Sequence, residues 1–198
     1  MVERQASSRI LTIPNVISFI RLLAIPVFWW LLLGEDDVAA ATILFAVVAC
    51  TDWVDGYLAR KLDQVSRLGK ALDPVADRLM IASAVIAGLI AGIVPPVIGW
   101  GLIAREAYMV VVTLMVVSRG RGTLEVRWLG KAATLVVYSS IGWFYFAAIP
   151  FLEPLLRPLA WVAGVTGLVL YWITAFQYTG DAFRIMSGLE STARPEEL

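Results

Sequence analysis

Four aspartates at fixed spacing are the residues of this chain best suited to chemistry. They lie between two long apolar runs, in the pattern D-x-x-D-G-x-x-A-R-x8-G-x-x-x-D-x-x-x-D. The fixed positions are Asp52, Asp55, Gly56, Ala59, Arg60, Gly69, Asp73 and Asp77. Carboxylates are costly beside hydrocarbon unless something binds them. One or two hard divalent cations with phosphate attached would bind them, so the pattern predicts phosphoryl-transfer chemistry at a membrane surface.

The other fixed positions are small or basic. Glycine, as at Gly56 and Gly69, lets a nucleotide or phosphate approach the backbone closely, and Arg60 is placed to meet a phosphate or ribose. Two other interpretations are open: small residues also serve helix packing in membranes, and the acids could form an ion-pair network or a cation site in a transporter. Eight matched positions between Asp52 and Asp77 favour the chemical interpretation.

The composition indicates an integral membrane protein. The 198 residues are 60% hydrophobic, with 8 tryptophans, 1 cysteine and no histidine. The lack of histidine excludes a Ser-His-Asp triad, a phosphohistidine intermediate and a Cys/His zinc site. Proton transfer must therefore fall to a carboxylate, a lysine or a metal-bound group.

The apolar segments predict an all-α fold of six transmembrane helices in one domain, residues 1–198. Each segment is close to the roughly 20 residues that a helix needs to cross a bilayer. The predicted spans are residues 14–33, 38–59, 70–93, 96–117, 131–150 and 158–178. We expect residues 1–12 to form an N-terminal cytoplasmic segment and residues 181–198 a polar C-terminal tail.

The basic residues predict the orientation. With six spans both termini lie on one side, and that side also holds the loops with Arg60, Lys61, Arg67, Lys70, Arg119, Arg121, Arg127 and Lys131. The opposite side holds only Arg157. By the positive-inside rule, the termini and the acidic end of the second and third spans face the cytoplasm. We expect a multi-pass protein of the cell membrane with its active site on the cytoplasmic side.

The second and third spans must bring the acids together. Asp52 and Asp55 lie three residues apart and Asp73 and Asp77 four apart, so each pair shares one face of its helix. The two spans form an antiparallel hairpin joined by residues 60–69, which lets the pairs converge near the cytoplasmic interface. Such a cluster needs neutralising charge, and a pair of divalent cations supplies it.

The stretch from Asp52 to Asp77 resembles the signature of the CDP-alcohol phosphatidyltransferases at every signature position. The similarity extends across most of the chain. The further segments are Ile13–Ser18 with Arg21, Leu72–Arg78, Ala104–Glu106 and Leu129–Thr134. These segments resemble the phosphatidylglycerophosphate synthase and cardiolipin synthase branches of the family.

The resemblance implies a transferase of phospholipid biosynthesis that moves the phosphatidyl group of CDP-diacylglycerol to an alcohol and releases CMP, with no covalent enzyme intermediate. It implies two ions of Mg²⁺ or Mn²⁺, held by Asp52, Asp55, Asp73 and Asp77, with Asp77 also the catalytic general base. It implies CDP-binding roles for Gly56, Ala59, Arg60 and Gly69. It also implies a homodimer among membrane lipids, with no nucleic-acid partner.

The acceptor would be a polyol phosphate or a lipid. Arg105, well inside the fourth span, and Lys131, at the start of the fifth, are candidates for binding an anionic acceptor; Arg105 could instead pair with a nearby acid. We favour glycerol 3-phosphate, which would give phosphatidylglycerol phosphate. The alternatives are cardiolipin synthesis from phosphatidylglycerol, phosphatidylinositol phosphate synthesis and, from a different class, a divalent-cation transporter, which would hold its acids near the bilayer midplane.

Overall fold

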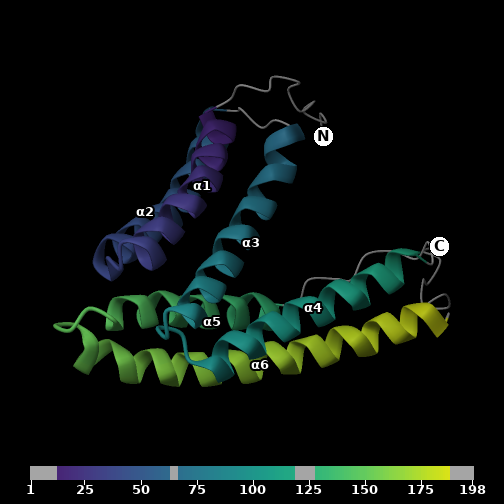
Figure 1. Cartoon of the computed structure of the whole chain (residues 1–198). Helices are drawn as coiled ribbons and strands as arrows, with labels where there is room; N and C mark the ends of the chain where they lie inside the picture. Colours follow the sequence, from purple (N-terminus) through teal and green to yellow (C-terminus); the bar gives the residue numbers. More distant parts are fainter. Residues whose placement is uncertain (1–12, 63–66, 119–127, 188–198) are drawn as a thin grey trace. The chain divides into compact units, whose positions relative to one another are not determined.

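The computed structural model describes residues 13–62, 67–118 and 128–187, and for residues 13–16, 52–62, 67–75, 77 and 185–187 it describes the backbone alone. Within these ranges the protein is all-helical (Figure 1), as predicted. The elements are α1 (Ile13–Trp29), the π-helical turn η1 (Trp30–Gly34), α2 (Val38–Leu62), α3 (Arg67–Ile90), α4 (Pro96–Ser118), α5 (Trp128–Ala147) and α6 (Glu153–Ser187).

Local capping explains where two of the helices begin. Asp37 precedes α2, and its side chain accepts a hydrogen bond from the Ala40 N–H at 2.9 Å, the usual role of an aspartate at a helix N-terminus. Pro96 opens α4, where its missing N–H costs nothing. The Pro95 carbonyl accepts from the N–H groups of Ile98 and Gly99, both at 3.0 Å.

Helix α6 is longer than the sequence predicts. The predicted span, 158–178, treats Pro158 as a boundary, whereas the helix runs from Glu153 to Ser187 with Pro158 inside it. Pro158 lies in the second turn, where it removes only the bond to the Pro154 carbonyl. At about 1.5 Å per residue, this helix exceeds the roughly 30 Å of a bilayer core. Residues 181–187, predicted as part of a polar tail, continue the helix.

Three helices of the described ranges are long and apolar enough to cross a membrane: Ile17–Gly34, Pro96–Ser118 and Glu153–Arg184. Within the residues whose side chains are described, α2 and α3 contribute the shorter apolar segments Val38–Thr51 and Arg78–Ile90. Large apolar side chains such as Leu114, Val162 and Phe176 are exposed on the helices, as suits contact with lipid. The protein is therefore a membrane protein, while the six-span count and the orientation of the termini stay predictions.

The chain divides into two compact units. The first holds residues 1–94 and 141–157, that is α1, α2 and α3 with the end of α5 and the start of α6. Within it, α1 packs against both α2 and α3. The second holds residues 95–140 and 158–198, that is α4 with the rest of α5 and α6. The prediction of a single domain stays a prediction.

Three buried aromatic rings form the core of the first unit. Phe28 of α1, Phe45 of α2 and Tyr145 of α5 contact one another, with ring centroids 5.5 to 6.1 Å apart. Phe28 and Tyr145 are 0% exposed. Edge-to-face and tilted aromatic contacts of this kind add specific geometry to the burial of apolar area, so the triangle fixes three helices against one another.

Close approach of helices marks the second unit. A Cβ atom at Gly167 of α6 would lie 2.8 Å from the backbone nitrogen of Val137 on α5, so the two helices meet almost backbone to backbone. On the other side of α6, Trp172 donates its indole N–H to the Gly101 carbonyl of α4 at 3.2 Å. Small residues at such contacts are typical of helix packing in membranes.

Candidate functional site

All eight positions of the acidic pattern lie within helices, not in a loop. Asp52, Asp55, Gly56, Ala59 and Arg60 belong to α2, and Gly69, Asp73 and Asp77 belong to α3. The prediction of a long connection over residues 60–69 is wrong, because α2 continues to Leu62 and α3 already begins at Arg67. The polar residues at these two ends had suggested a loop, yet they extend the helices.

Tyr145 links the two helices that carry the acids. Its hydroxyl donates to the Ala84 carbonyl of α3 at 2.6 Å, and its own carbonyl accepts from the Thr42 hydroxyl of α2 at 3.3 Å. The convergence of the two pairs of acids stays a prediction, because the side chains of the four aspartates lie outside the described side chains.

The donor set of this pattern fits a hard divalent cation. Four carboxylates and no histidine or cysteine match the oxygen ligands that Mg²⁺ and Mn²⁺ prefer. The side chains of the four aspartates, and those of the predicted CDP-binding positions Gly56, Ala59, Arg60 and Gly69, lie outside the described side chains. Metal binding, the number of ions, the CDP contacts and the role of Asp77 as base therefore stay predictions.

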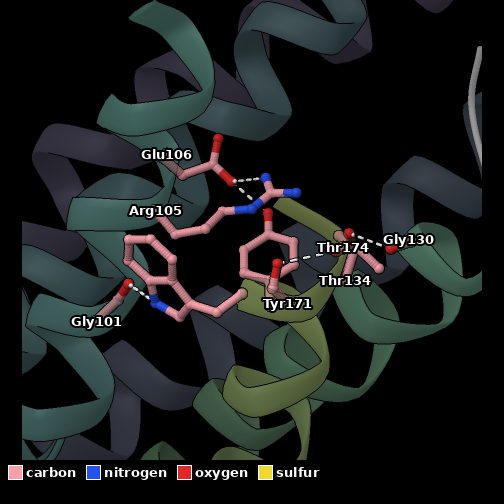
Figure 2. A network of polar contacts seen from close by, with 8 residues as sticks. Gly101, Arg105, Glu106, Gly130, Thr134, Tyr171 and Thr174 are labelled. Carbon is pink, nitrogen blue, oxygen red and sulfur yellow. Dashed lines mark hydrogen bonds and ion pairs between the residues drawn. The ribbon is translucent and has the colours of Figure 1, made fainter. Parts of the chain in front are cut away.

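The best-defined polar cluster lies in the second unit, on α4 and α6 (Figure 2). Arg105 is 8% exposed. One of its terminal nitrogens donates to Glu106 Oε1 at 3.1 Å, and its guanidinium lies over the Tyr171 ring, 3.6 Å from the centroid. The Tyr171 hydroxyl donates to the same Glu106 oxygen. The structure thus places Arg105 beside an acid, one of the two alternatives that the sequence left open.

The sequence did not single out Glu106 and Tyr171 as site residues. Glu106 carried a signal, since an acid directly after an arginine inside an apolar run indicates an ion pair. Tyr171 carried none, because it is 66 residues away from Arg105 in the chain. Only the packing of α6 against α4 reveals its contact.

The second predicted acceptor residue is placed differently. Lys131 lies in the first turn of α5 and is exposed. Its position near the start of the fifth helix agrees with the prediction, although α5 begins slightly earlier, at Trp128. Arg119, Arg121 and Arg127 lie outside the described residues. A role of Lys131 in acceptor binding stays a prediction.

Comparison with known proteins identifies the chain's relatives. The model of a family described as CDP-alcohol phosphatidyltransferase matches residues 11–175. The chain is 33% identical over 197 residues to a protein of Streptomyces coelicolor named cardiolipin synthase (CMP-forming), a match that covers 92% of this chain and 88% of the relative. The acidic pattern lies inside the matched range.

Two further relatives bear a different name. A protein of Mycobacterium tuberculosis named probable phosphatidylglycerophosphate synthase is 32% identical over 191 residues, which is 94% of this chain and 88% of the relative. A protein of Bacillus subtilis named CDP-diacylglycerol--glycerol-3-phosphate 3-phosphatidyltransferase is 31% identical over 178 residues, 81% of this chain and 91% of the relative. The names of these relatives thus divide between cardiolipin synthase and enzymes named for phosphatidylglycerophosphate or glycerol 3-phosphate.

Proposed function

Because the chain belongs to the CDP-alcohol phosphatidyltransferase family, we propose that it transfers the phosphatidyl group of CDP-diacylglycerol to glycerol 3-phosphate, giving phosphatidylglycerol phosphate and CMP. The observation that carries the proposal is the family match over residues 11–175, which includes every position of the acidic pattern. The names of the Mycobacterium and Bacillus relatives support glycerol 3-phosphate as acceptor. The match also favours an enzyme over a cation transporter.

The chemistry proposed for the site is a single displacement at phosphorus. The acceptor hydroxyl forms a bond to the phosphatidyl phosphorus, the pyrophosphate bond to CMP breaks, and Asp77 takes the hydroxyl proton as general base. Asp52, Asp55, Asp73 and Asp77 would hold two Mg²⁺ or Mn²⁺ ions. Bound ions of this kind neutralise the phosphate charge and stabilise the leaving group. No residue forms a covalent intermediate.

The remaining predicted residues take the substrates. Gly56, Ala59, Arg60 and Gly69 would accommodate the CDP moiety, and Arg105 and Lys131 the anionic acceptor. The donor keeps its acyl chains in lipid while its nucleotide needs water, so we place the reaction at the cytoplasmic face of the cell membrane. A homodimer is part of the proposal through the family alone.

Cardiolipin synthesis is the second candidate, with the same donor and phosphatidylglycerol as acceptor. The observation that favours it is the match to the Streptomyces protein named cardiolipin synthase (CMP-forming). Its chemistry at phosphorus is the same, and both acceptors present a glycerol hydroxyl next to a phosphate ester. The two proposals therefore differ in the acceptor alone.

An acceptor panel tests the proposal. Purified protein in detergent, with CDP-diacylglycerol and Mg²⁺, is offered glycerol 3-phosphate, phosphatidylglycerol or inositol phosphate separately, and CMP release is measured. We expect CMP with glycerol 3-phosphate. Turnover with phosphatidylglycerol alone would replace the proposal by its alternative. Nucleotide-independent metal flux in liposomes, with no CMP from any acceptor, would favour the transporter.

A further inference from the structure

The cluster of Arg105, Glu106 and Tyr171 holds a charged pair in a helix that is otherwise suited to lipid. Arg105 lies near the middle of α4 (Pro96–Ser118), a helix apolar enough to span a membrane. Ionisable residues in such places are costly and generally serve a function. Glu106 neutralises the charge of Arg105, but neutralisation alone does not explain the geometry of the cluster.

The ion pair uses less of the guanidinium than it could. A carboxylate beside an arginine commonly accepts two parallel hydrogen bonds, whereas here Glu106 Oε1 accepts one from Arg105, at 3.1 Å, and another from the Tyr171 hydroxyl. The Nε atom of Arg105 is buried and has no hydrogen-bond partner among the described residues. Such an atom loses its hydration without compensation, so its N–H group is still able to donate a hydrogen bond to a ligand.

Tyr171 contacts both members of the Arg105–Glu106 pair. Its ring lies against the guanidinium, 3.6 Å from ring centroid to Cζ, and fixes the plane of the group. Its hydroxyl donates to Glu106 Oε1, the same oxygen that accepts from Arg105, and so holds the carboxylate in place beside the guanidinium. Figure 2 shows the three side chains gathered in this way. Without the hydroxyl, Glu106 keeps its bond to Arg105 but loses the second bond that holds its carboxylate in place.

We propose that Glu106 and Tyr171 are positioning residues that keep Arg105 ready to donate to a phosphate-ester oxygen of the acceptor. The inference rests on the proposed function, in which Arg105 is an acceptor ligand. Because a phosphomonoester and a phosphodiester present the same oxygens, the cluster would serve glycerol 3-phosphate or phosphatidylglycerol alike. The residue that binds the acceptor is Arg105, and the other two act through it.

The test compares Tyr171→Phe with a matched control, Tyr108→Phe. Tyr108 also bridges α4 and α6, through a hydrogen bond of 2.7 Å to the Thr179 hydroxyl, so both variants lose one tyrosine hydroxyl between the same two helices. Of these two tyrosines, Tyr171 is the one with a hydrogen bond to Glu106 and a ring contact with Arg105. Binding of glycerol 3-phosphate and of CDP is measured by isothermal titration on the purified full-length protein in nanodiscs, with and without phosphatidylglycerol in the lipid.

We expect Tyr171→Phe to raise the Kd for glycerol 3-phosphate about tenfold to a hundredfold, the loss of one hydrogen bond to a charged group. The Kd for CDP should stay within about twofold in both variants, and Tyr108→Phe should bind glycerol 3-phosphate like the wild type. In an Arg105→Ala background, Tyr171→Phe should have no further effect, because the hydroxyl acts through Arg105. A structural role of Tyr171 would not produce this pattern.

Glu106→Asp gives a second, independent variant, because it keeps the charge but withdraws the carboxylate by one methylene. It should weaken glycerol 3-phosphate binding in the same way, and it decides the matter if Tyr171→Phe fails to fold. Equal Kd values for glycerol 3-phosphate in wild type, Tyr171→Phe and Glu106→Asp would overturn the proposal, as would a wild type that binds neither acceptor. The wild type could instead bind phosphatidylglycerol alone, which is measured by competition of that lipid with CDP-diacylglycerol. The wild type and the two variants are then compared by their affinity for phosphatidylglycerol. Binding that depends on Tyr171 without CMP release would overturn the proposed function and leave this inference standing.

Discussion

Gly167 of α6 should be one of the least replaceable residues of the second unit. A Cβ atom there would lie 2.8, 2.9 and 3.0 Å from the N, Cα and Cβ atoms of Val137, whereas ordinary contact begins at 3.4 Å. Since two of these atoms belong to the backbone of α5, no side-chain rotation relieves the clash. The helices must separate by about 0.6 Å, the difference between 3.4 and 2.8 Å.

Overpacking of this kind costs about 1–3 kcal/mol, and alanine returns about 0.5–1 kcal/mol through its better helix propensity. Gly167→Ala should therefore lower the free energy of unfolding by up to about 2.5 kcal/mol, and by about 1–3 kcal/mol relative to a glycine-to-alanine change that meets no clash. Gly180→Ala on the same helix is the matched control, because no packing neighbour in the described part of the chain lies within 4 Å of a Cβ there, and it should gain about 0.5–1 kcal/mol.

The assay is reversible unfolding of both purified variants by sodium dodecyl sulfate in mixed micelles, followed by circular dichroism. The difference between Gly167→Ala and Gly180→Ala isolates the clash, because both substitutions change helix propensity by the same amount. A Gly167→Ala protein as stable as Gly180→Ala would refute the close approach of α5 and α6.

Three further predictions follow from the account. Asp77→Ala should reduce CMP release by about 10²–10⁴, the usual contribution of a general base, while CDP binding by titration persists; CMP release at the wild-type rate would remove the base assignment. Chelation by EDTA should abolish CMP release and Mg²⁺ should restore it, so activity that survives exhaustive chelation would argue against metal at the aspartates. Tyr145→Phe should lower the free energy of unfolding by about 0.5–1.5 kcal/mol through loss of the bond to the Ala84 carbonyl; unchanged stability in the same micelle assay would show that this hydrogen bond does not hold α3.

Much of the fold was predictable because the apolar segments and the helix-ending residues between them indicate the same boundaries. Residues 96–117 were predicted as a span and α4 runs from Pro96 to Ser118, since Pro95 and Pro96 set its start. The predictions failed where a local signal had two meanings. Pro158 suggested a boundary but is tolerated near the start of α6, and the polar ends of α2 and α3 suggested a loop but remain helical.

In the candidate site, too, the features that are local in sequence were predictable and the contacts between distant residues were not. The acidic pattern was visible because its residues are close together in the chain, and its assignment to two consecutive helices held. The partner of Arg105 was visible only as an alternative, since Glu106 is its neighbour in sequence. The contact with Tyr171 and the close approach at Gly167 join residues that are distant in the chain, and no local periodicity reports such pairs.

The transfer of label from glycerol 3-phosphate into lipid is the direct test of glycerol 3-phosphate as the acceptor. Purified protein is incubated with radiolabelled glycerol 3-phosphate, CDP-diacylglycerol and Mg²⁺, and the chloroform-soluble fraction is counted against reactions that lack the donor or contain Asp77→Ala. We expect label to enter the lipid fraction as phosphatidylglycerol phosphate, with one CMP released for each labelled molecule transferred. If the protein sample binds CDP but the label stays in the aqueous phase, the result would contradict glycerol 3-phosphate as the acceptor.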